Sequence, residues 1–294
     1  MNAPALLSAL RPRQWTKNAV VLAAFFFALG DREQQIGVAL LGRAALAALL
    51  FCALSSAVYL MNDARDAELD RAHPVKRRRP IASGVLPVWA ALAWAAGLAA
   101  AALAGAWRLR PALLEVFGAY LALQILYTFS LKRVPLVDLF VIAIGFVLRA
   151  LAGGVALGVR ISPWLLLCTL LLALFLGLCK RRHELLRQAD GPVTRPALAG
   201  YSERLLDQFI AIISAATIVS YSIYTFWPDT VAKFGTARLG LTIPLVIFGV
   251  FRYLDLVYRH ELGDQPEQAL LTDLPLLADI ALYGVTVLAI FAWR

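Results

Sequence analysis

Residues 62–84 read N-D-A-R-D-A-E-L-D-R-A-H-P-V-K-R-R-R-P-I-A-S-G, and apolar runs of membrane length flank them on both sides. Four carboxylates lie in the first half of this stretch, and six Lys and Arg side chains overlap and follow them. Charge of this density beside membrane-length segments is costly to bury, which favours a functional site at the end of a spanning helix. The competing interpretation is a solvated charged loop that only sets the orientation of the chain in the membrane.

The first half of the stretch predicts a metal site on a helix. Asn62, Asp66 and Asp70 recur every fourth residue, so on a helix they share one face, which Asp63 borders. Carboxylate and amide oxygens are ligands that Mg²⁺ accepts, and Mg²⁺ usually shares its remaining positions with substrate phosphates. We therefore expect Asn62, Asp66 and Asp70 to bind Mg²⁺ with help from Asp63, and the three aspartates to be the catalytic carboxylates.

The second half of the stretch is rich in cations and predicts a phosphate-binding segment. Lys76, Arg77 and Arg79 are its candidate ligands, because Lys and Arg side chains bind phosphate oxygens through charge-assisted hydrogen bonds. Arg149 is a further candidate, since it lies deep in an apolar segment where a charge usually faces a cavity or a partner. Asp138 shares its helical face, so a purely structural salt bridge is the alternative for Arg149.

The same residues carry a family resemblance. The motif N-D-x-x-D-x-x-x-D followed by R-P-I-A-S-G resembles the first aspartate-rich motif of the UbiA superfamily of intramembrane prenyltransferases. The finer pattern D-R-x-H-P-x-K-x-x-R-P-I-A-S-G, and R-P-R-Q-W-T-K-N at residues 11–18, resemble its decaprenyl-phosphate phosphoribosyltransferase branch. The resemblance extends over most of the chain, from about residue 11 to the last helix.

The resemblance implies a Mg²⁺-dependent enzyme of the membrane. Its donor would be 5-phosphoribosyl diphosphate and its acceptor a polyprenyl (decaprenyl) phosphate. The products would be polyprenyl-phosphoryl 5-phosphoribose and diphosphate. The resemblance also implies substrate-binding roles for Lys17, Tyr127 and Lys132, although an interfacial anchoring role is an alternative for Lys17 and Tyr127.

A departure from the superfamily pattern bears on the donor. Where ordinary members carry a second aspartate-rich motif for a prenyl diphosphate, this chain has Lys180, Arg181, Arg182 and Glu184. More cations suit a ligand with a further phosphate, so we count Lys180, Arg181 and Glu184 among the substrate-binding candidates. One alternative is an ordinary prenyltransferase acting on an aromatic acceptor, which Asp138 or Asp273 as metal ligands would favour. A second alternative is a non-catalytic carrier of lipid phosphates.

Composition predicts an all-α, polytopic membrane protein. The chain is 61% hydrophobic with a mean hydropathy of +0.73, and its apolar stretches have the length of membrane spans. We expect one domain over residues 1–294, with about nine transmembrane helices in one bundle and a polar cavity that faces the cytoplasm. The expected helices lie at about 16–29, 38–62, 87–107, 112–131, 136–157, 163–179, 205–227, 239–258 and 274–293. The polar motif loops are expected at 62–86, 131–135, 180–204 and 259–273.

The distribution of charge predicts the orientation in the inner (plasma) membrane. With nine spans the motif loops lie on the side of the N-terminus, and Lys and Arg are more numerous there, so this side is expected to be cytoplasmic. The net charge of +9 suits membrane lipid head groups and phosphorylated substrates, and it does not predict nucleic-acid binding because the charges separate membrane spans. The three cysteines are isolated, which disfavours a disulfide or a zinc site.

Overall fold

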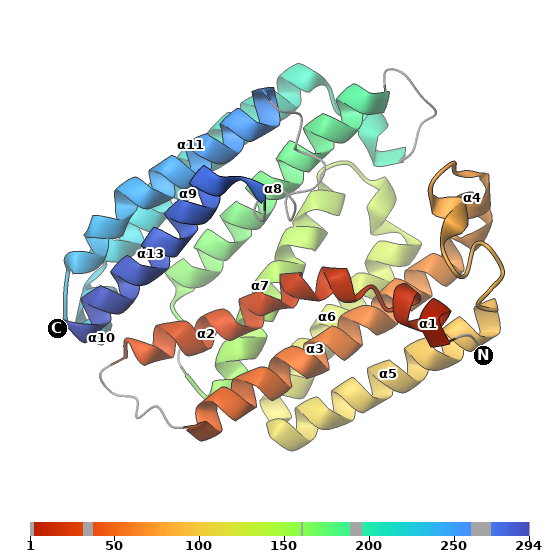
Figure 1. The fold of residues 1–294 in the computed structure, drawn as a ribbon, viewed down its shortest axis with the longest axis horizontal. Helices are drawn as coiled ribbons and strands as arrows, with labels where there is room; N and C mark the ends of the chain where they lie inside the picture. The colour runs from red at the N-terminus through yellow and green to blue at the C-terminus, as the bar shows by residue number, and fades with distance from the viewer. Residues whose placement is uncertain (1–2, 32–37, 160, 189–195, 260–271, 294) are drawn as a thin grey trace. The chain divides into compact units, whose positions relative to one another are not determined.

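The computed structural model describes residues 3–31, 38–159, 161–188, 196–259 and 272–293, and all regular structure in these ranges is helical (Figure 1). Eight helices in these ranges are long and apolar enough to cross a membrane, judged by length and composition. A helix rises about 1.5 Å per residue, so even a span of 19 residues extends for about 28 Å, close to the thickness of the hydrocarbon core. The all-α, multi-pass prediction is confirmed.

The eight candidate spans account for most of the expected helices. They are α3 (Val38–Arg65), α5 (Val88–Leu109), α6 (Pro111–Phe129), α7 (Val137–Leu157), α8 (Pro163–Gln188), α9 (Glu203–Phe226), α11 (Ile243–Arg259) with the 3₁₀ helix η5 (Arg238–Thr242) before it, and α13 (Leu274–Ala292). The remaining expected helix, 16–29, is the 3₁₀ helix η1 (Pro12–Ala19) followed by the ten-residue α2 (Val20–Leu29). The expectation of about nine transmembrane helices therefore corresponds, in the described residues, to eight long helices and the shorter α2.

Shorter helices connect or precede the spans. They are α1 (Ala3–Ala9), α4 (Ala67–Ala72), η2 (Lys76–Arg78), η3 (Leu131–Arg133), η4 (Pro196–Gly200) and α10 (Pro228–Phe234). Side-chain caps occur at the starts of two spans, α9 and α13. Ser202 caps α9 by accepting a hydrogen bond from the backbone N of Leu205, and Asp273 caps α13 by accepting one from the backbone N of Leu276.

The expected polar loop at 180–204 is wrong in its first part. Helix α8 continues through the charged residues and ends at Gln188. Lys, Arg, Glu and Leu are strong helix formers, so the change from apolar to charged residues marks where the helix leaves the apolar region and not where it ends. The expected loop at 62–86 is likewise part helical, because it includes the end of α3 and the whole of α4. The segment 259–273 lies almost wholly outside the described residues.

The helices form two compact units. Unit 1 comprises Met1–Phe27, Ile36–Ser130 and Leu148–Arg160, and unit 2 comprises Ala28–Gln35, Leu131–Val147 and Ile161–Arg294. Helix α7 therefore contributes its first half to unit 2 and its second half to unit 1. The expectation of one domain over the whole chain stays a prediction.

Unit 1 is built on α3, which runs beside α5 and also contacts α6 (Figure 1). Its core includes an aromatic cluster, with the ring of Phe51 5.0 Å from that of Phe117 and 4.7 Å from that of Tyr120, both edge-on. The second half of α7 packs against α2 at Gly153. A Cβ added there would lie 2.0 Å from the carbonyl O of Val21, so only glycine permits this approach.

Unit 2 is built on the antiparallel pair α8 and α9, with α11 packed against α9 and against α13 (Figure 1). Its core includes the edge-on pair Phe175 and Tyr253, whose ring centroids are 5.4 Å apart. Arg182 connects three helices of this unit. It donates to Asp207 and Glu203 of α9, and its guanidinium lies 4.2 Å from the ring centroid of Tyr258 in α11.

Candidate functional site

The predicted metal ligands lie where α3 gives way to α4. Asp66 is the break between the two helices, with φ −95° and ψ 6°. The helical hydrogen bonds nevertheless continue across it, since the backbone N of Asp66 donates to Asn62 O at 3.0 Å and that of Asp70 to Asp66 O at 2.8 Å. Asn62, Asp66 and Asp70 therefore follow one another at one turn of helix, as their spacing predicts.

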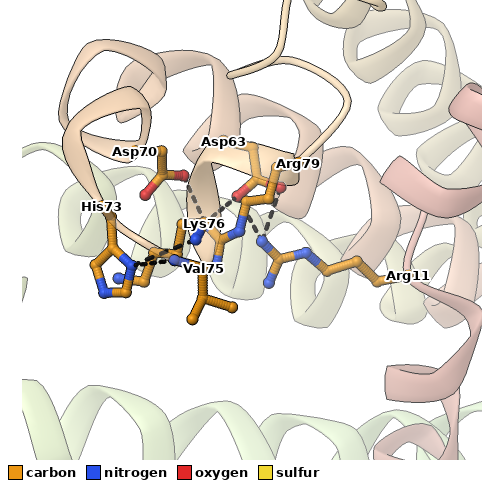
Figure 2. A network of polar contacts seen from close by, with 7 residues as sticks. All are labelled: Arg11, Asp63, Asp70, His73, Val75, Lys76 and Arg79. Atoms are coloured by element: carbon orange, nitrogen blue, oxygen red, sulfur yellow. Dashed lines mark hydrogen bonds and ion pairs between the residues drawn. The ribbon is translucent and has the colours of Figure 1, made fainter.

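Two arginines hold the buried carboxylates of this cluster (Figure 2). Arg11 donates from Nη2 to Asp63 Oδ1 at 2.5 Å and to Oδ2 at 2.7 Å. Arg79 donates from Nη1 to Asp63 Oδ1 at 3.0 Å and to Asp70 Oδ2 at 2.7 Å. The side chains of Asp63 and Asp70 are 4% and 6% exposed, so the two guanidinium groups offset the cost of burying two negative charges.

The segment after α4 returns Arg79 to the acids. Its apolar residues Ile81 and Leu86 lie in the same buried cluster as Leu60 of α3, which anchors the segment. Gly84 has φ +82°, a left-handed conformation that favours glycine and turns the chain toward α5. The motif R-P-I-A-S-G is thus a turn that fixes the position of Arg79.

His73 folds the basic segment back on itself, and the sequence reasoning did not assign it a role. Its Nδ1 accepts hydrogen bonds from the backbone N of Val75 at 3.2 Å and of Lys76 at 3.3 Å (Figure 2). Removal from water, followed by the nearby positive charge of Lys76, lowers the pKa of His73 below its usual value. The neutral imidazole with a free Nδ1 is the form that accepts both bonds.

The other predicted ligands of unit 1 differ in exposure. Arg77 is exposed, whereas Lys76, Lys17 and Tyr127 are half-buried. Tyr127 lies in the last turns of α6, whose end reaches that of α3, since the Arg65 guanidinium lies 5.6 Å from the ring centroid of Phe129. These placements are compatible with the predicted roles, which stay predictions.

Arg149 is buried in a polar network within unit 1. It donates from Nε to Asn18 Oδ1 at 2.8 Å and from Nη2 to the Tyr120 hydroxyl at 3.0 Å, and its guanidinium lies over the rings of Phe51 and Tyr120. Asn18 in turn donates to Ser55 Oγ at 3.1 Å. The sequence predicts that Arg149 lies deep in an apolar segment, but it does not predict these partners.

Asp138 and Arg181 form a buried ion pair within unit 2, with side chains 0% and 2% exposed. Arg181 donates from Nε to Asp138 Oδ2 at 2.9 Å, and its Nη2 lies 2.8 Å from the same oxygen. It also donates from Nη1 to Glu184 Oε2 at 2.7 Å. These contacts give Arg181 and Glu184 a structural role that the sequence did not predict. Lys132 and Lys180 are half-buried in the same unit, and their predicted role in phosphate binding stays a prediction.

Tyr201 also contacts Asp138 of this ion pair. No sequence signal predicted this role for Tyr201. Its hydroxyl donates to Asp138 Oδ1 at 3.2 Å and accepts from the backbone N of Leu136 at 2.6 Å. Leu136 has φ +66°, a strained conformation for a branched residue, which this hydrogen bond helps to hold. Burial, with the negative charge of Asp138 adding to it, raises the pKa of Tyr201 to about 12, so the hydroxyl keeps its proton.

The acids that an ordinary prenyltransferase would need for a second metal have other partners here. Asp138 is held by Arg181 and Tyr201, and Asp273 accepts hydrogen bonds from Arg252 at 2.7 and 3.0 Å. Three further acids of the expected loop at 259–273, Glu261, Asp264 and Glu267, lie outside the described residues.

The donor chemistry around Asn62 fits a hard cation. Asn62 Oδ1 is buried and has no hydrogen-bond partner in the described structure, although such an oxygen ordinarily has one. Asn62 lies one helical turn before Asp66 and precedes Asp63 in the sequence, and amide and carboxylate oxygens are ligands of hard cations. In the described ranges no three His, Cys, Asp or Glu side chains are gathered closely enough to hold a metal ion, and Asp63 and Asp70 contact arginines.

Comparison with known proteins identifies the family of this chain. A model of the UbiA prenyltransferase family matches residues 19–270. Decaprenyl-phosphate phosphoribosyltransferase of Mycobacterium tuberculosis is 40% identical over 249 residues, which cover 83% of this chain and 82% of that protein. The protein of the same name from Corynebacterium glutamicum is 41% identical over 231 residues, covering 76% and 68%.

A solved structure shows the same fold. The UbiA homolog from Archaeoglobus fulgidus, bound to GPP and Mg²⁺, superposes with a TM-score of 0.74 at 19% identity and covers 98% of this chain and 99% of that one. At this identity the likeness concerns the fold, while the family match spans most of the sequence. The chain belongs to the UbiA prenyltransferase family.

Proposed function

We propose that this protein is a membrane phosphoribosyltransferase. It transfers 5-phosphoribosyl from 5-phosphoribosyl diphosphate to a polyprenyl phosphate such as decaprenyl phosphate, and it releases diphosphate. The observation that carries the proposal is the 40% identity, over 83% of the chain, to a protein named decaprenyl-phosphate phosphoribosyltransferase. The active-site side is proposed to be the cytoplasmic face of the inner membrane, where the cation-rich segments would meet a soluble phosphorylated donor.

The donor diphosphate is proposed to bind at the end of α3. Asn62, Asp66 and Asp70 would hold Mg²⁺ there, and support comes from the orphaned Asn62 oxygen and from a related fold solved with Mg²⁺. When bound, Mg²⁺ supplies positive charge that neutralises the departing diphosphate oxygens. Asp63 acts through its two arginines, because both of its oxygens already accept hydrogen bonds from Arg11.

Both proposed substrates are anionic, and the cationic segments of this chain would bind their phosphates. A donor diphosphate and an acceptor phosphate repel each other, and Lys and Arg side chains offset that repulsion. Lys76, Arg77 and Arg79 are the proposed phosphate ligands of unit 1, while Lys132 and Lys180 are those of unit 2. The acceptor phosphate is already an oxyanion near neutral pH, so its attack on the anomeric carbon of ribose needs no base from the protein.

Two structural observations favour this function over an ordinary prenyltransferase. Asp138 is engaged by Arg181 and Asp273 by Arg252, so these acids serve as partners of arginines. An enzyme for a prenyl diphosphate remains the second candidate, because the A. fulgidus homolog is solved with GPP. The hypothesis of a non-catalytic carrier does not explain why Asn62, Asp66 and Asp70 follow one another at one helical turn.

A transfer assay tests the proposal. Purified protein in detergent is mixed with polyprenyl phosphate and 5-phosphoribosyl diphosphate labelled in the ribose, with Mg²⁺ or with a chelator. We expect label to enter the organic phase only with Mg²⁺. Label that stays in the aqueous phase under both conditions, with lipid movement in vesicles, would instead support the carrier.

A further inference from the structure

The hydrogen bonds of Arg79 set up a competition at Asp70. Arg79 shares Nη1 between Asp63 Oδ1 at 3.0 Å and Asp70 Oδ2 at 2.7 Å. Asp70 is also a proposed ligand of the donor-bound metal ion. A guanidinium and a divalent cation repel each other, so the contact between Arg79 and Asp70 opposes metal binding at this carboxylate.

Arg79 has further N–H groups that could donate hydrogen bonds to a phosphate. Within the described ranges its side-chain hydrogen bonds all come from Nη1, which leaves the N–H groups of Nε and Nη2 for another acceptor. The side chain is 29% exposed, while the carboxylates it contacts are 4% and 6% exposed. Arg79 can therefore reach an arriving anion without leaving its turn of the chain.

Arg11 keeps the charge of Asp63 compensated if Arg79 moves to another anion. Both oxygens of Asp63 accept hydrogen bonds from Arg11, so Asp63 remains paired when Arg79 moves away. Without Arg11, the same movement would leave a buried carboxylate uncompensated, which is strongly unfavourable. The Arg11 guanidinium also contacts the Tyr59 ring, whose centroid is 5.1 Å from the guanidinium carbon.

We propose that Arg79 couples metal binding to donor binding by exchanging Asp70 for a donor phosphate, with Arg11 as the positioning residue that keeps Asp63 paired. The contact with Arg79 neutralises Asp70 and keeps its affinity for a metal ion alone low. When a metal-bound diphosphate binds, Arg79 forms a contact with a phosphate and loses its contact with Asp70. Asp70 can then bind the metal ion. The inference rests on the proposed donor site but not on which group the diphosphate carries.

Metal binding without turnover tests the exchange. Mn²⁺ retained by the full-length protein in detergent is measured by equilibrium dialysis, with and without inorganic diphosphate. For the wild type we expect diphosphate to raise the Mn²⁺ affinity by about tenfold or more, within the usual range of coupling between two sites. By linkage, Mn²⁺ must raise the affinity for diphosphate by the same factor.

Variants of adjacent arginines separate a specific contact from a general charge effect. Arg79→Gln should bind Mn²⁺ alone more tightly than the wild type and gain little from diphosphate. Arg78→Gln removes the same charge from an exposed residue for which no side-chain hydrogen bond occurs in the described structure, so it should behave like the wild type. Arg79→Lys, which keeps the charge, provides a second test if the Gln variant does not fold.

Two results would overturn the exchange. One is a wild type whose Mn²⁺ affinity is the same with and without diphosphate. The other is equal Mn²⁺ affinity in Arg79→Gln and Arg78→Gln. The diphosphate group is common to 5-phosphoribosyl diphosphate and to a prenyl diphosphate. The binding results with inorganic diphosphate therefore do not depend on the outcome of the transfer assay. Failure of phosphoribosyl transfer with coupling intact would overturn the proposed function alone.

Discussion

Arg11 donates from a single nitrogen to both carboxylate oxygens of Asp63, a residue 52 positions further along the chain. This contact joins the start of η1 to the end of α3, the helix that carries the proposed metal ligands. The N-terminal basic segment therefore compensates the buried carboxylate of Asp63.

The first prediction concerns this contact. Arg11→Gln should lower the free energy of unfolding by about 1–2 kcal/mol, less than for a fully buried pair because Arg11 is 26% exposed. Thermal unfolding of the detergent-solubilised protein measures the loss. Arg13→Gln is the matched control, since Arg13 is exposed, and it should unfold at the wild-type temperature. Equal melting temperatures for the two variants would show that the Arg11–Asp63 contact is not stabilising.

The second prediction concerns Asp66, a proposed metal ligand at the break between α3 and α4. Asp66→Asn keeps the size of the side chain and removes its charge, so turnover should fall by at least about a hundredfold while the melting temperature changes little. Rates across a range of Mg²⁺ concentrations check this expectation. Activity near that of the wild type at every Mg²⁺ concentration would remove Asp66 from the metal site.

Asp138 should give the opposite pattern. It is fully buried and paired with Arg181, so Asp138→Asn leaves a buried guanidinium short of a countercharge and should cost about 3–5 kcal/mol of stability. The melting temperature of the variant measures this cost. A variant that melts like the wild type but loses Mg²⁺-dependent activity would mean that Asp138 is a metal ligand, as in the alternative with a second metal site.

The fourth prediction concerns His73, whose Nδ1 caps the backbone of Val75 and Lys76. Loss of such a local side-chain cap is worth about 0.5–2 kcal/mol, so His73→Ala should raise the KM for the donor several-fold and leave kcat nearly unchanged. His73→Asn, which offers an oxygen acceptor at a similar place, should restore much of the loss. If Asn and Ala raise KM equally, the imidazole acts by something other than accepting these two bonds.

Much of the fold is predictable from the sequence because membrane thickness sets the length of the apolar runs. The runs that give α3, α5 and α13 begin and end within a few residues of their expected bounds. The end of α8 was misplaced because charged residues were taken to stop the helix, although they are good helix formers. The break at Asp66 left no local signal such as proline or glycine.

The site is less predictable than the fold. Spacing along one helix predicts that Asn62, Asp66 and Asp70 follow one another, since that relation is local. The partners of Asp63 and Arg149 are not local: Arg11 lies 52 positions from Asp63, and Asn18 lies 131 positions from Arg149. Such pairings depend on how the helices pack, so they emerge only from the three-dimensional structure.

The choice of donor is the central claim, and a direct comparison of two donors tests it. The same purified protein is given 5-phosphoribosyl diphosphate with polyprenyl phosphate, or a prenyl diphosphate with an aromatic acid, and kcat/KM is measured for each pair with Mg²⁺. We predict a preference of about a thousandfold or more for 5-phosphoribosyl diphosphate, because a site lined with cations discriminates strongly against a donor that lacks the 5-phosphate. An equal or higher kcat/KM for the prenyl diphosphate would contradict the account and identify an ordinary prenyltransferase.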